Sequence, residues 1–240
     1  MHFSSEEITA LAQAEATAPR YDIYVLIHKA LRAYMVDTLL VVGQLDVDDE
    51  AALAQAAGRV GELLAFCRSH LTHENQFIHP ALERHVAGSS QAIAAEHVGH
   101  GQAIDALGAV VQALASCPRP ARGRVARVLY QQLALFVAHN FEHMHQEETA
   151  HNAVLWAHHR DEEIAAIEGA IHASLDPAEA MLCMRWMLPH LAPAERALVL
   201  SGLRAQAPAP VFDAVLALVR PHLSADQWRR LTQDLTLGHA

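Results

Sequence analysis

Apolar residues recur along most of the chain at the three- and four-residue spacing of amphipathic helices. One such stripe, which includes Tyr24, Leu31, Met35 and Val42, predicts a first long helix over about residues 21–45. Further stripes predict helices that extend from Asp48 to Pro80, from an N-cap at Ser89 to Pro118, and from Arg122 past Trp156. Four long helices with short connections are typical of an antiparallel up-down four-helix bundle, so the predicted fold class is all-α.

Shorter helical segments are predicted on either side of these four helices. At the N-terminus, Ser4 and Glu7 have the spacing of a capping box and predict a short leading helix. After the fourth helix, Asp161 opens another one, and further helical segments punctuated by prolines follow it. We therefore divide the chain into a bundle domain at residues 1–160 and a helical C-terminal extension at residues 161–240 that packs on the bundle.

Composition and charge narrow the classes of protein to which the chain can belong. The 240 residues are 52% hydrophobic but only 5% aromatic, which favours helices packed through alanine and leucine over sheets. A formal net charge of −10 argues against a nucleic-acid partner, because phosphate binding needs a concentrated basic face. No signal peptide and no membrane-spanning apolar run is found, so we expect a soluble, cytoplasmic protein with no membrane partner. Three widely separated cysteines suggest neither disulfides nor a thiolate metal site.

Histidine is unusually frequent, with 18 residues against 17 lysines and arginines together, spread through the predicted helices. Two segments, His70–Glu74 and His143–Glu147, share the pattern H-x-x-x-E. Because four residues span about one helical turn, each segment projects an imidazole and a carboxylate from the same side of its helix. The helix that precedes each segment carries one inward histidine, His28 or His97, so the two halves form a degenerate repeat.

Unpaired polar side chains of this kind are costly in a bundle core. Each buried ionised group would lower stability by several kcal/mol, which is a large share of the stability of a typical domain. Metal ions compensate such a cost, because imidazole nitrogen and carboxylate oxygen suit iron, manganese and zinc, and a carboxylate can bridge two ions. The pattern therefore predicts a metal site inside the bundle.

Four segments carry a resemblance to a known family: I-H-K-A-L-R around His28, H-L-T-H-E-N-Q-F-I-H-P from His70, E-H-V-G-H around His97, and E-H-M-H-Q-E-E around His143. Over about residues 21–160 the chain resembles the hemerythrin family, specifically its bacterial HHE-type cation-binding members. The resemblance implies two iron ions, replaceable by manganese, zinc or nickel on purification. It also implies that the two glutamates bridge the ions and leave an open site for dioxygen. The implied ligands are His28, His70, Glu74, His97, His143 and Glu147.

One position departs from the pattern of the oxygen-carrying hemerythrins, which place a second ligand histidine one turn after the residue that matches His97. This chain has Gly101 at that position, with His100 adjacent. Either His100 supplies a fifth imidazole or water fills the position, and water would favour redox or sensing chemistry over reversible carriage. Other histidines flank the site and receive no role: His73, His79, His139, His145 and His151.

The expected function is to bind dioxygen or a related small oxidant, such as nitric oxide or peroxide, for sensing, storage or detoxification. Two alternatives stay open, namely a di-iron oxidoreductase acting on an organic substrate and a metal-independent helical adaptor. Four histidines against two glutamates favour a binding protein over an oxidative enzyme, and no residue is given a catalytic role. The oligomeric state, with a homodimer as one alternative, and the role of residues 176–240 are left open.

Overall fold

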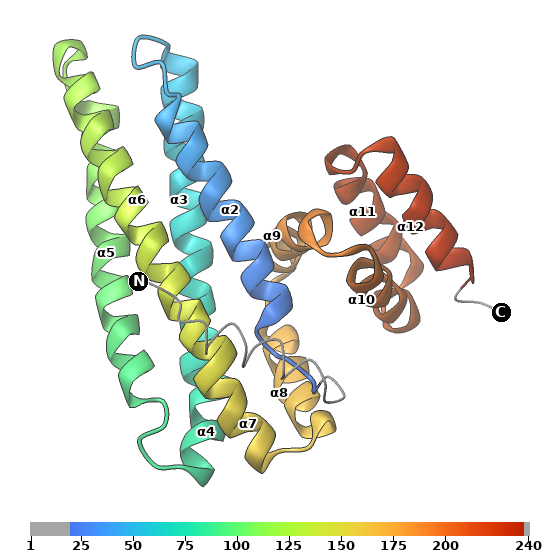
Figure 1. Ribbon diagram of the computed structural model, residues 1–240. Coiled ribbons are helices and arrows are strands. Elements are labelled where there is room, and N and C mark those ends of the chain that lie inside the picture. The colour runs from blue at the N-terminus through green and yellow to red at the C-terminus, as the bar shows by residue number, and fades with distance from the viewer. Residues whose placement is uncertain (1–19, 238–240) are drawn as a thin grey trace, which may run out of the picture.

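The structure is a computed structural model that describes residues 20–237 (Figure 1). Within this range the chain forms helices and turns without any strand, which confirms the all-α prediction. The short leading helix predicted from Ser4 and Glu7 lies outside the described residues. None of the helices in the described range combines the length and apolarity that crossing a lipid bilayer requires.

Four long helices lie side by side along one axis of the molecule (Figure 1), namely α2 (Val25–Gly43), α3 (Glu50–His73), α5 (Gln91–Ser116) and α6 (Arg122–Gln146). Helix α2 packs against α3 and α6, and α5 packs against the same two helices. Apolar stripes meet at their centre, where Leu31, Leu63, Leu107 and Leu133 are almost fully buried. Removal of this apolar surface from water stabilises the packing of the four helices.

Two of these helices widen immediately beside the H-x-x-x-E segments. Helix α3 continues through a π-helical turn, η1 (Glu74–Ile78), into α4 (His79–His85). Helix α6 does the same through η3 (Glu147–His151) into α7 (Asn152–His158). Pro80, which was expected to disturb the second helix, occupies the first turn of α4, where its missing N–H is tolerated. π-helical turns are rare in proteins, but those that occur often lie at functional sites. Here each of the two turns begins at a predicted ligand.

Helix starts depend on local caps, and one predicted cap is wrong. The Asp49 side chain accepts hydrogen bonds from two backbone N–H groups in the first turn of α3, at 2.8 and 3.2 Å. Ser89 does not cap α5, because the helix begins one residue later and the Ser89 hydroxyl has no partner among the described residues. Instead, the Glu83 carboxylate accepts from the N–H groups of Gly88 and Ser90, at 2.7 and 2.9 Å.

The C-terminal part of the described chain is a series of shorter helices. The helix predicted to open at Asp161 is confirmed. Trp186 in α9 stacks on Tyr34 in α2 with ring centroids 4.1 Å apart, and α8 contacts the π-helical turn η1. The division at residues 160 and 161 stays a prediction. The remaining elements are η2 (Arg119–Ala121), α8 (Asp161–Ser174), α9 (Pro177–Met187), η4 (Leu188–His190), α10 (Pro193–Gln206), α11 (Ala209–Val219), η5 (Arg220–His222) and α12 (Ala225–Leu237).

Candidate metal centre

The structure brings all six predicted ligand residues together inside the four long helices. The potential ligand atoms of His28, His70, Glu74 and Glu147 lie within 4.8 Å of one another. A second group within the same limit combines both glutamates with His97 and His143. The two groups therefore share two carboxylates, an arrangement in which two neighbouring cations can be bridged.

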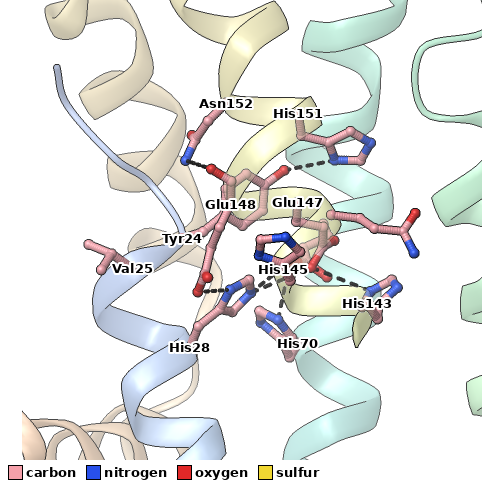
Figure 2. Close-up of polar contacts among 12 residues, drawn as sticks. Tyr24, Val25, His28, His70, His143, His145, Glu147, Glu148, His151 and Asn152 are labelled. Carbon is pink, nitrogen blue, oxygen red and sulfur yellow. Dashed lines mark hydrogen bonds and ion pairs between the residues drawn. The ribbon is translucent and has the colours of Figure 1, made fainter. Parts of the chain in front are cut away.

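Helical spacing explains why these side chains converge. His70 Nε2 lies 3.1 Å from Glu74 Oε1, and His143 Nε2 lies 3.4 Å from Glu147 Oε2, each across one turn of its own helix. His28 reaches the same space from α2, with its Nε2 3.5 Å from Glu147 Oε2. Figure 2 shows His28, His70, His143 and Glu147 pointing toward one another. Three helices thus present nitrogen and oxygen atoms to one small volume.

Unsatisfied polar atoms show that these residues suit a bound cation. Within the described residues, the Nε2 atoms of His28 and His70 and all four carboxylate oxygens of Glu74 and Glu147 are buried and have no hydrogen-bond partner. Buried carboxylates without partners are strongly destabilising, and native proteins avoid them unless an ion or water compensates. Nitrogen and oxygen donors in this ratio fit a divalent transition metal, and no thiol is part of either group.

The outer nitrogens of three histidines are held by oxygen acceptors. In each case the imidazole Nδ1–H donates outward, so Nε2 faces the shared space. Nε2 is therefore the atom that each of these imidazoles would offer to a metal. The acceptors are Glu148 Oε1 for His28 at 3.0 Å, Asn75 Oδ1 for His97 at 2.9 Å, and Glu96 Oε2 for His143 at 2.9 Å.

Protons and cations compete for this site. Burial opposes protonation of His28, but its hydrogen bond with Glu148 and the nearby charges of Glu74 and Glu147 raise its pKa to about 9. Burial also opposes protonation of His143, whereas Glu147 and Glu96 raise its pKa to about 8. In turn, the imidazoles hold the pKa of Glu74 well below its usual range, against the effect of burial. Because a metal ligand must present a lone pair, a cation that binds here displaces the imidazole protons.

His100 lies beside the centre but outside the two groups. Its ring packs against His143 with centroids 4.7 Å apart, and its buried Nδ1 has no partner among the described residues. Burial and the neighbouring imidazoles lower the pKa of His100 to about 4, so the ring is neutral. A Cβ on Gly101 would lie 4.0 Å from the Arg68 guanidinium. Position 101 therefore lies toward Arg68, whose guanidinium pairs with Asp105 at the exposed side of α5.

Sequence reasoning assigned no role to two further histidines that lie at the centre. His79 and His151 form a third potential group with Glu147, and both imidazoles are buried. Burial together with Glu147 raises the pKa of Tyr24 well above its usual value, so the Tyr24 hydroxyl keeps its proton, and it forms a hydrogen bond with His151 Nδ1 at 3.1 Å. Burial lowers the pKa of His151, which favours the neutral imidazole, and its buried Nε2 has no hydrogen-bond partner among the described residues.

Imidazoles and carboxylates converge here from four packed helices and are buried. This arrangement is typical of helical proteins that bind metal cations in their core. The model of the Hemerythrin HHE cation binding domain family matches residues 20–154, and the chain therefore belongs to this family. This match confirms the family resemblance drawn from the four histidine-containing segments. Comparisons with curated proteins and with solved structures gave no significant match.

Proposed function

We propose that the chain binds two metal ions through His28, His70, Glu74, His97, His143 and Glu147, with the two glutamates shared between the ions. The unsatisfied buried carboxylate oxygens support this proposal most strongly, because every one of them belongs to a shared residue. We also propose that α2, α3, α5 and α6 form the antiparallel up-down bundle, at residues 1–160, that holds the site, and that residues 161–240 form an extension packed on it.

We infer that the physiological metal is iron and that manganese, zinc or nickel replaces it in purified protein. Four imidazoles and two carboxylates suit iron, and bound iron would supply reversible oxidation and an affinity for dioxygen, nitric oxide or peroxide. The high share of imidazole favours binding of the small oxidant over attack on an organic substrate. The proposed role is therefore sensing, storage or detoxification of such a molecule.

The chain's own residues prepare the site by fixing imidazole orientation. The Arg32 guanidinium donates two hydrogen bonds to Glu148, at 2.6 and 2.9 Å, and Glu148 accepts the Nδ1 proton of His28. This chain of contacts turns His28 Nε2 toward the centre before any ion is bound. Glu74 and Glu147 are almost fully buried, and removal from bulk water strengthens their attraction for a cation.

Iron loading tests the proposal directly. Purified protein loaded anaerobically with ferrous iron should retain two ions per chain and should change its near-ultraviolet absorption when exposed to air or nitric oxide. His143→Ala is expected to abolish the change, whereas the exposed His139 on the same helix provides a matched His139→Ala control that should keep it. Failure of the native chain to hold stoichiometric iron would rule out the proposed function.

Removal of an outer acceptor should weaken the metal site without disrupting the bundle. Glu96→Ala is expected to lower metal affinity by about 10–100-fold, because His143 loses the oxygen that fixes its ring and tautomer. Glu96→Gln retains an acceptor oxygen and should have a smaller effect. Competition with a chromogenic chelator measures both affinities, and Asp105→Ala on the same helix serves as the control. Unchanged affinity in Glu96→Ala would show that this contact does not orient a ligand.

A further inference from the structure

A cavity of about 70 Å³ lies between the long helices and the C-terminal helices α8 and α9, which lie beside α2 in Figure 1. This volume is several times the roughly 10–15 Å³ that one water molecule requires. The wall is mostly apolar, and an apolar cavity of this kind favours apolar guests over water. Its apolar lining includes Ile23, Ile27, Phe66, Ile171, Leu175 and Met187.

The inner end of the cavity is the candidate metal centre. His70 and Glu74 both line the cavity, so its contents face two of the proposed ligands. The His70 side chain is 13% exposed, compared with 0% for His28, 3% for His97 and 2% for His143. The most accessible of the four imidazoles is therefore the one at the cavity, which indicates that a molecule reaches the centre from this side.

The polar groups farther from the centre give the cavity a charge preference. Two glutamates contribute to its lining, with Glu168 accepting a hydrogen bond from the Tyr21 hydroxyl and Glu179 accepting one from the Ser69 hydroxyl. Both side chains are carboxylates, whose ordinary ionised form is negatively charged. The chain as a whole carries a formal net charge of −10. The two lining carboxylates and the negative net charge of the chain both disfavour the entry of anions.

We propose that this cavity is the entry and binding site for a small uncharged, apolar molecule of a few atoms, and that α8 and α9 complete it. The inference rests on the proposed function, because it makes a neutral diatomic molecule, such as nitric oxide or dioxygen, the preferred ligand over an anion. Both helices follow residue 154, where the family match ends. They therefore add a wall that the matched domain does not supply.

Cavity filling tests the entry route in the full-length, iron-loaded chain. Met187→Trp and Ile171→Phe are each expected to slow association of nitric oxide by about tenfold or more while iron content stays at the native value. Leu198→Trp on α10, whose side chain position is 73% exposed, is the matched control and should leave the rate unchanged. Circular dichroism verifies folding of each variant. A native association rate in both folded, fully loaded filling variants would overturn the proposal.

Two further measurements separate this inference from the proposed function. The double variant Glu168→Gln and Glu179→Gln should accelerate azide association with the ferric protein a few-fold and leave nitric oxide association unchanged. Xenon binding, followed by the ¹²⁹Xe chemical shift, requires no iron and should be present in the native chain and lost in Met187→Trp. If the native chain binds iron but no xenon enters the cavity, the inference fails while the proposed function stands. If xenon binds but iron does not, the proposed function fails, and only the proposal that the cavity is a binding site stands.

Discussion

Glu147→Ala is expected to reduce tight metal binding from two ions per chain to none. The Glu147 carboxylate belongs to both overlapping groups of potential ligands, and its side chain is fully buried. Its loss removes a shared negative charge and leaves His143 and His97 facing one another, with their Nε2 atoms 3.0 Å apart. By contrast, His97→Ala removes a ligand from one group only and is expected to leave one ion. Metal content after gel filtration measures both outcomes.

A matched control for this experiment lies on the same helix. Glu142 is exposed, so Glu142→Ala removes the same charge without touching the centre and should retain both ions. A conservative variant, Glu147→Gln, keeps the shape and the burial but not the charge, and it should also lose tight binding. Retention of two ions in Glu147→Ala would show that this carboxylate does not bridge the proposed metal positions.

The long helices could be predicted because burial follows the helical period. The stripe that contains Leu31 and Met35 is buried in α2 as expected. The helix starts at Val25 rather than near Tyr21, because the Asp22 side chain accepts hydrogen bonds from the N–H groups of Tyr24 and Val25, at 2.9 and 3.0 Å. The apolar pattern thus predicts which segments are helical, whereas a local side-chain contact determines where the helix begins.

The convergence of the six polar residues could also be predicted, since each H-x-x-x-E segment spans one turn. The positions that follow could not, because both helices widen into π-helical turns at the glutamates. A π-helical turn adds one residue to the bonded ring, so counting by 3.6 residues fails beyond Glu74 and Glu147. His79 therefore points to the centre although its spacing of five residues from Glu74 is unfavourable in an α-helix, whereas His151 lies about one turn from Glu147 by either count. Their recurrence five and four residues after the two glutamates was the available signal.

The cavity could not be predicted from any local pattern. Ile23, Phe66, Ile171 and Met187 line one space although they lie far apart in the chain. Each of these residues alone fits an ordinary core position on an amphipathic helix. Only the packing of α8 and α9 on the long helices leaves a gap beside His70, and packing of this kind depends on tertiary contacts that periodicity does not specify.

Metal removal is expected to destabilise the protein most strongly at alkaline pH. In the metal-free protein, protonated His28 and His143 compensate the buried carboxylates, and their pKa values are raised to about 9 and about 8 from an unfolded value of about 6.5. A raised pKa contributes stability that is fully present below pH 6.5 and is lost as the pH rises through 8 and 9. For the fully buried His28, this loss is about 3 kcal/mol.

Bound metal should remove this alkaline loss, because the cation replaces the protons as the partner of Glu74 and Glu147. An ion present at about 1,000 times its dissociation constant adds roughly 4 kcal/mol to stability. Thermal unfolding with manganese and after chelation should therefore give midpoints that differ little at pH 6 and increasingly between pH 7 and 9. Glu148→Gln, which weakens the contact that raises the pKa of His28, should flatten the metal-free profile. Parallel profiles with and without metal would contradict the coupling, since they would show that the imidazole protons and the cation do not share one site.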